Sequence, residues 1–109
     1  MSVRWSTLLL ALAALLPAGT ARADAIDGDW CSGDGQRMSI RGDHIVIPSG
    51  KQIAGNYSRH AFDYVIPSGD TGAGDTVNIV LRSEYLAFSR QGVNGDRSTE
   101  WRRCKDLNS

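Results

Sequence analysis

The residues with the clearest chemistry are the only two cysteines of this 109-residue chain, Cys31 and Cys104. Trp30 directly precedes Cys31, and Trp101 lies three residues before Cys104. Side chains alternate between the two faces of a strand, so if the cysteines meet on one face, both tryptophans lie on the other. Because an indole has a large apolar surface, this pattern predicts a Cys31–Cys104 disulfide towards the outside and two buried indoles.

Arg103 is expected on the same side as the indoles, because it has the same parity as Trp101 in a strand. Its guanidinium would stack there over Trp30. The disulfide would close most of the chain into one loop and stabilise the fold by roughly 4 kcal/mol on a chain-entropy model. Trp30, Trp101 and Arg103 are therefore the residues predicted to close the domain.

The remaining residue types give little support for catalytic activity. The two histidines, His44 and His60, need a further ligand to make a zinc site, and no Gly-x-Ser-x-Gly elbow is present. Ser58, His60 and Asp63 are too close together in one turn and strand to converge as a triad. We therefore expect no enzyme activity, no catalytic residue and no cofactor.

Calcium is the strongest metal candidate, although the sequence predicts no metal site. Residues 70–75 contain the carboxylates of Asp70 and Asp75 on a glycine-rich backbone, and Asp34 and Asp96 are expected at the same end of the molecule. Hard cations bind several such oxygens, but the segment has no EF-hand pattern. A solvated loop is the more common outcome for such a stretch, and calcium binding stays open as the alternative.

The first 23 residues are predicted to be a secretory signal peptide. Arg4 precedes an apolar run over residues 8–16, and Ala21-Arg22-Ala23 has the small-x-small form of a cleavage site, with a rival cut after Ala25. The apolar run is shorter than the ~20 residues of a membrane span. We expect an exported bacterial protein, periplasmic or secreted, with no stable membrane insertion after cleavage.

Residues 24–109 are predicted to form one small monomeric domain. Residues 1–23 contain two of the twelve basic residues and none of the twelve acidic ones, so the remainder has ten against twelve. This balance, without a basic stripe, argues against a nucleic-acid partner.

The sequence predicts an all-β domain. Six Gly-Asp pairs mark turns, and no stretch keeps a 3.6-residue apolar period. The segments between them predict a small antiparallel up-and-down β-barrel, or alternatively a small β-sandwich. The eight expected strands are residues 28–32, 36–41, 44–48, 51–57, 61–67, 76–82, 85–90 and 99–104.

Alternation predicts which side chains face the core. The expected inward residues are Met38, Ile40, Phe62, Tyr64, Ile66, Val77, Ile79, Leu81, Leu86 and Phe88. Up-and-down connections also place tight turns and both termini at one end and the longer loops at the other. A ligand mouth is expected among Tyr64, Tyr85, Asp70 and Asp75, with the loops over residues 67–75 and 91–98 around it.

The sequence also contains an internal echo, since residues 44–50 end in Ile-Pro-Ser-Gly and residues 63–69 do the same. The strands that end at Pro48 and Pro67 are expected to run in the same direction. A duplicated hairpin and convergence on one turn sequence both fit this repeat.

Three resemblances follow from these residues. Gly28-Asp29-Trp30 with the late Arg103 resembles the Gly-x-Trp and arginine pair of lipocalin-like (calycin) barrels, which implies a barrel closed by that stack. The Gly-x-Trp-Cys start and Trp-x-Arg-Cys end are similar to those of small exported proteobacterial proteins. The architecture also resembles that of periplasmic lysozyme inhibitors, although their Ser-Gly-x-x-Tyr element is not matched after Ser49-Gly50 or Ser68-Gly69.

The expected function is a non-catalytic binding module of the cell envelope that holds a small ligand or a peptide at the barrel mouth. The alternative is a protein-interaction or inhibitor role in the envelope. A large interior void would favour the first, and a filled core with an exposed aromatic patch would favour the second.

Overall fold

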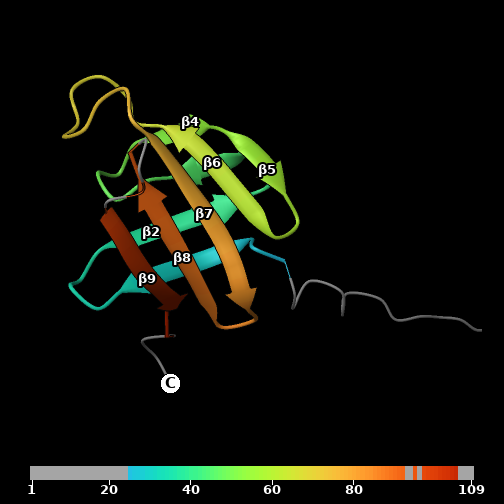
Figure 1. Ribbon diagram of the computed structural model, residues 1–109. Helices are drawn as coiled ribbons and strands as arrows, with labels where there is room; N and C mark the ends of the chain where they lie inside the picture. Colours follow the sequence, from blue (N-terminus) through green and yellow to red (C-terminus); the bar gives the residue numbers. More distant parts are fainter. Residues whose placement is uncertain (1–24, 93–94, 96, 106–109) are drawn as a thin grey trace, which may run out of the picture.

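The computed structural model describes residues 25–92, 95 and 97–105, so the predicted signal peptide lies outside the described residues. Within these residues the chain forms strands and turns and no helix (Figure 1). The strands are β1 (Gly28–Ser32), β2 (Arg37–Arg41), β3 (His44–Val46), β4 (Gln52–Ala54), β5 (Asn56–Ser58), β6 (Ala61–Val65), β7 (Thr76–Ser83), β8 (Leu86–Gln91) and β9 (Arg97–Arg103).

All nine strands belong to one antiparallel sheet that curls into a nearly closed barrel (Figure 1). The order is β4-β3-β2-β1-β9-β8-β7-β6-β5, so consecutive strands pair except β4 and β5, which form the two edges, and β1 pairs with β9. The first and last strands therefore meet, with Trp30 opposite Arg103 and Ser32 opposite Trp101. The predicted up-and-down barrel is confirmed, and the sandwich alternative is wrong.

The strand expected over residues 51–57 is instead two short strands that meet at Gly55. β4 pairs with β3, β5 pairs with β6, and the bend between them brings the two edges of the sheet together. A Cβ atom at Gly55 would lie 2.5 Å from the carbonyl oxygen of Asp63 and 2.6 Å from Cε1 of Phe62. Only glycine fits this close approach, which explains why the chain bends there.

The interior of the barrel is filled by side chains. Trp30, Phe62 and Met38 are among the largest fully buried groups, and Trp101 is 4% exposed. The predicted inward positions on the strands before β8 are confirmed. Those that are buried are Met38, Ile40, Phe62, Tyr64, Ile66, Val77 and Ile79, and Leu81 is half-buried against them.

The expectation that Leu86 and Phe88 face inward is wrong. In β8, Ala87 and Ser89 are the buried residues, and Phe88 lies on the outer face. The reason lies in β9, where Trp101 is opposite Ala87 and its indole N–H donates to the Ser89 hydroxyl at 3.0 Å. A buried indole leaves room only for small neighbours and needs an acceptor, and Ala87 and Ser89 provide both.

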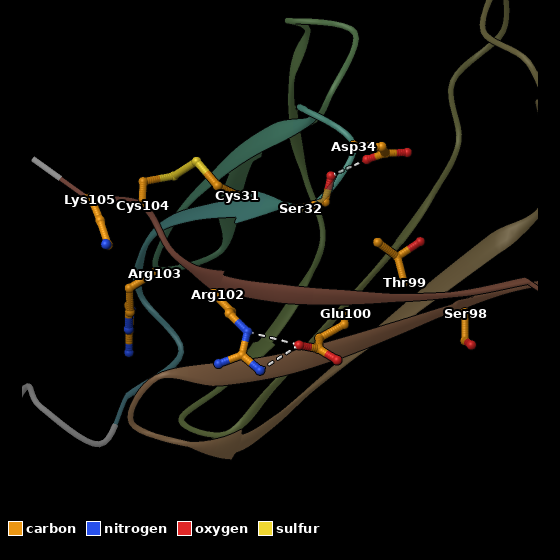
Figure 2. Close-up of a pocket in the computed structure, with 11 residues that line it drawn as sticks. Cys31, Ser32, Asp34, Ser98, Thr99, Glu100, Arg102, Arg103, Cys104 and Lys105 are labelled. Carbon is orange, nitrogen blue, oxygen red and sulfur yellow. Dashed lines mark hydrogen bonds and ion pairs between the residues drawn. A yellow bond between two sulfur atoms is a disulfide. The ribbon is translucent and has the colours of Figure 1, made fainter. Parts of the chain in front are cut away.

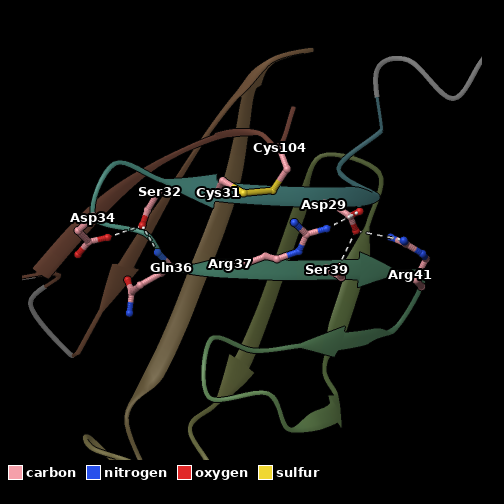
Figure 3. Close-up of a disulfide and its surroundings, with 9 residues drawn as sticks. All are labelled: Asp29, Cys31, Ser32, Asp34, Gln36, Arg37, Ser39, Arg41 and Cys104. Carbon is pink, nitrogen blue, oxygen red and sulfur yellow. Dashed lines mark hydrogen bonds and ion pairs between the residues drawn. A yellow bond between two sulfur atoms is a disulfide. The ribbon is translucent and has the colours of Figure 1, made fainter. Parts of the chain in front are cut away.

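The predicted disulfide is confirmed on the outer face of the β1–β9 junction (Figure 3). The Cα atoms of Cys31 and Cys104 lie 5.0 Å apart, and both residues are half-buried. Beside the bridge, Asp29 accepts a hydrogen bond from Ser39 and pairs with Arg37 at 3.2 Å and Arg41 at 3.1 Å. The Ser39 hydrogen bond, with these arginines, lowers the pKa of Asp29.

The connections sort to the two ends of the barrel as predicted. The end that we call the closed end carries residues 25–27, the short turns β2–β3, β5–β6 and β7–β8, and residues 104–105. The looped end carries the connections β1–β2, β3–β4, β6–β7 and β8–β9, and the β6–β7 loop spans residues 66–75. β3 and β6 run in the same direction, as the Pro48 and Pro67 echo predicts.

Candidate functional site

The closed end is sealed by the short segment that precedes β1. Ile26 is fully buried, and its backbone N–H donates to the carbonyl of Arg59 in the β5–β6 turn at 2.8 Å. The Trp30 indole N–H donates back to the carbonyl of Ile26 at 2.9 Å. The segment therefore lies across the barrel end, and an apolar side chain occupies the space that a ligand would need.

Arg103 locks this segment in place, and the stacking of its guanidinium over Trp30 is as the sequence predicts. Its guanidinium carbon lies 4.1 Å from the centre of the Trp30 ring. The same group donates to the carbonyls of Ala25 at 2.8 Å and Asp27 at 2.5 Å, and to that of Glu84 at 2.7 Å. Burial lowers the pKa of Arg103, while the charges of Asp27 and Glu84 oppose that change. One side chain thus ties three separate parts of the chain to the closed end.

Gly28 is required for that lock. Its φ angle is +130°, and a Cβ atom there would lie 2.5 Å from Nη1 of Arg103. The Gly-x-Trp motif is thereby explained physically, since the glycine leaves space for the guanidinium that covers the tryptophan.

The looped end contains an open depression of about 460 Å³, which we call the mouth depression. Its lining combines apolar side chains with groups that donate and accept hydrogen bonds. The apolar residues are Ile47, Pro48 and Ile66, and the polar ones are Gln36, Ser49, Tyr64, Asp70, Thr71 and Gln91. Its volume falls in the range of small-molecule sites.

Side-chain contacts join the β3–β4 and β6–β7 loops at the rim of the mouth depression, and we call these contacts the rim clasp. Asp70 pairs with the Lys51 ammonium at 2.8 Å and accepts a hydrogen bond from the Ser49 hydroxyl at 2.7 Å. Lys51 and Asp70 occupy equivalent positions of the internal echo, directly after Ser-Gly in each copy. The hydrogen bonds from Lys51 and Ser49 lower the pKa of Asp70.

Tyr64 is the most informative group in the mouth depression. It is only 9% exposed, and within the described residues its hydroxyl has no hydrogen-bond partner. Burial, with a smaller contribution from the nearby charge of Asp70, raises the pKa of Tyr64 to about 12, so the hydroxyl is a neutral donor and acceptor. Because it has no protein partner there, the hydroxyl at the mouth depression offers a hydrogen bond to a ligand or to water.

The other predicted mouth residues divide between the two ends. Asp75 lies with the mouth, where its carboxylate accepts a hydrogen bond from Gln91 at 3.3 Å. Tyr85 lies in the β7–β8 turn at the closed end and is 67% exposed, so its place in the predicted mouth is wrong. The turn residues between β7 and β8 reverse the chain at the end opposite to Asp70.

In the described residues, the arrangement of the carboxylates does not support the calcium alternative. Asp70 is occupied by Lys51 and Ser49, Asp75 contacts Gln91, and Asp34 accepts the Ser32 hydroxyl. Among the residues that the structure describes, no three His, Cys, Asp or Glu side chains gather in a way that could hold a metal. Asp96, the fourth carboxylate of that hypothesis, lies outside the described residues.

A second depression, of about 660 Å³, follows the seam between the β1–β2 loop and the first half of β9 (Figure 2). β1 ends at Ser32, opposite Trp101, so residues 97–100 of β9 pair only with β8. Figure 2 shows Ser98, Thr99 and Glu100 along this strand, across from Ser32 and Asp34. Glu100, on this strand, is already paired with Arg102 at 2.7 Å.

Sequence reasoning missed Gln36 as part of the mouth depression, and it singled out neither Thr71 nor Gln91, although both fall in the loops predicted to surround the mouth. They are isolated polar residues in the β1–β2 connection, the β6–β7 loop and the end of β8, so no motif or spacing marks them, and only the closure of the barrel brings them together. No helix in the described part of the chain is long and apolar enough to span a bilayer. No protein-family model, no curated protein and no solved structure matches this chain.

Proposed function

We propose that this protein is an exported, non-catalytic binding module of the cell envelope, periplasmic or secreted, built on a lipocalin-like barrel. In this proposal the ligand sits in the mouth depression rather than in the barrel interior. The filled core supports this placement, because Trp30, Phe62 and Met38 occupy the space that an enclosed ligand would need.

The single observation that carries the proposal is the Tyr64 hydroxyl. Tyr64 lines the mouth depression and is only 9% exposed as a whole residue, and in the described residues its hydroxyl has no protein partner. Around it, the amides of Gln36 and Gln91 and the hydroxyl of Thr71 both donate and accept hydrogen bonds.

The lining also indicates the class of ligand. The rim charges of Lys51 and Asp70 neutralise each other, so a charged ligand gains little there. Apolar contact from Ile47, Pro48 and Ile66 lies beside the polar groups. A neutral molecule with many hydroxyl groups and one apolar face, such as a monosaccharide or disaccharide, matches this mixture.

Calorimetric titration with a panel of neutral mono- and disaccharides tests the proposal. We expect at least one sugar to bind the wild type, and Tyr64→Phe, which removes only the hydroxyl, to weaken that binding by about tenfold. Tyr57→Phe is the matched control, because Tyr57 donates to Asp27 at the closed end. The proposal fails if no sugar binds, or if Tyr64→Phe binds the same sugar as tightly as the wild type.

A further inference from the structure

The outer face of the sheet carries an aromatic residue that the core does not use. Phe88 lies on the outer face of β8, directly opposite Val80 of β7, which is 47% exposed. Together with Asn78, Arg82, Arg90 and Ser98 these residues line an open depression of about 550 Å³, which we call the β7–β8 patch.

Two guanidinium groups lie at opposite ends of this apolar pair. Arg82 sits where the pairing of β7 with β8 slips between Leu81 and Ser83, and its guanidinium carbon lies 5.3 Å from the centre of the Phe88 ring. Arg90 lies across from Asn78 at the other end. Both arginines are exposed, and in the described part of the chain neither forms an ion pair.

Two described carboxylates lie on the strands that flank the patch. Glu100 lies opposite Phe88 on β9, but Arg102 holds it at 2.7 Å. Asp63 lies opposite Asn78 on the β6 side, one strand further from Phe88. The β7–β8 patch is therefore an apolar pair flanked by two exposed positive charges that form no ion pair among the described residues, which favours an acidic partner.

The spacing of the two arginine positions along the sheet restricts the shape of that partner. Arg82 and Asn78, the residue opposite Arg90, are four positions apart on β7, so their Cα atoms are separated by roughly 13 Å at ~3.3 Å per residue. In an extended segment, residues i, i+2 and i+4 point to one face and span the same distance. In a helix, residues i and i+4 are only ~6 Å apart.

We propose that the β7–β8 patch docks an extended acidic segment of a partner protein, with one apolar side chain between two carboxylates at positions i and i+4. The apolar side chain would rest on Val80 and Phe88, and the carboxylates would meet Arg82 and Arg90. This surface is distinct from the mouth depression, and it gives the barrel a protein-interaction role in addition to ligand binding.

Fluorescence anisotropy with two labelled peptides of equal composition tests the proposal. The probe contains Glu-Thr-Leu-Thr-Glu, and its isomer contains Thr-Glu-Leu-Glu-Thr, which turns both carboxylates away from the leucine in an extended chain. We expect the wild-type protein to bind the probe at least about tenfold more tightly than the isomer, and more weakly as salt increases.

Variants test whether the probe peptide binds at the β7–β8 patch. Arg82→Gln combined with Arg90→Gln is expected to weaken probe binding by about tenfold or more, whereas Arg37→Gln, which removes one positive charge on β2, is expected to leave it within about twofold. All three positions are exposed, and near-ultraviolet circular dichroism checks that the variants remain folded. Equal binding of probe and isomer, or unchanged binding by the double variant, overturns the proposal. So does sedimentation with phosphatidylglycerol vesicles in the absence of peptide binding, because a lipid would then be the acidic partner.

Discussion

The closed end and the looped end of this barrel are held by different kinds of contact. At the closed end, buried Ile26 and Trp30 pack beneath Arg103, whose donors go to backbone carbonyls. At the looped end, the Ser49–Asp70 and Lys51–Asp70 contacts join side chains at the rim. Buried apolar groups and backbone acceptors stabilise more than rim ion pairs do, so we expect the contacts around Arg103 to stabilise the fold more than the rim contacts do.

This difference suggests a division of roles. A small barrel has few residues with which to build both a core and a binding site. Here the closed end uses its aromatic and apolar side chains to fill the space, and the looped end keeps isolated polar groups such as Tyr64 and Gln91 around an open depression. Changes at the closed end should therefore affect unfolding, and changes at the looped end should affect binding.

The largest expected effect is that of Trp30→Ala. It removes a fully buried indole together with the surface on which Arg103 rests, and it should reduce the free energy of unfolding by about 3–5 kcal/mol. Urea unfolding measures the change. Tyr85→Ala is the control, since this exposed side chain at the same end should alter stability by no more than about 0.5 kcal/mol. Equal stability of Trp30→Ala and wild type would contradict the role of the closed end.

Loss of the disulfide should come next. The bridge joins residues that are 73 positions apart, and its removal by Cys31→Ser with Cys104→Ser should cost about 2–4 kcal/mol. Dithiothreitol should lower the melting temperature of the wild type to a similar extent and leave the double variant unchanged. A wild type that melts at the same temperature with and without reductant would show that the bridge adds nothing to stability.

Gly28→Ala tests the arginine lock alone. The new methyl group would meet Nη1 of Arg103 at a backbone angle that alanine rarely adopts, and we expect a loss of about 1–3 kcal/mol. Gly33→Ala is the matched control, because a Cβ atom at Gly33 has no neighbour within 4 Å. Thermal unfolding measures the stability of both variants. Equal stability of Gly28→Ala and Gly33→Ala would contradict the requirement for glycine beside Arg103.

The smallest effect is expected for the rim clasp, through Asp70→Asn. The folded-state pKa of Asp70 is lowered from its ordinary value of 3.8, so its stabilising contribution is present above about pH 4 and is lost as the pH falls through the folded-state pKa. The melting temperatures of wild type and Asp70→Asn should therefore differ slightly at neutral pH and converge in acid. Asp34→Asn serves as the control, and a difference for Asp70→Asn that grows in acid would contradict the clasp.

The features that depend on alternation along a strand could be predicted from the sequence. The parities of Trp30, Cys31, Trp101 and Cys104 fix which side chains share a face, and the disulfide and both buried indoles follow from them. The stacking of Arg103 follows by the same argument. These predictions succeed because side chains alternate between the two faces of a strand whatever the neighbouring strands are.

The features that depend on the neighbouring strand could not be predicted. Phe88 is apolar, so its residue type alone predicts a core position. Ala87 and Ser89 face the core instead, because Trp101 on the adjacent strand needs a small neighbour and a hydrogen-bond acceptor. The bend at Gly55 likewise depends on the ring of Phe62. The mouth depression depends on closure of the whole barrel, which no local pattern encodes.

The most direct test of the division of roles is two-dimensional NMR of the labelled protein during titration with the sugar panel. We expect the chemical shifts of Gln36, Tyr64, Thr71 and Gln91 to change with the bound sugar. The Trp30 indole and the amide of Ile26 at the closed end should stay unchanged. Shifts centred on the closed end, or no shifts at the looped end, would contradict the account.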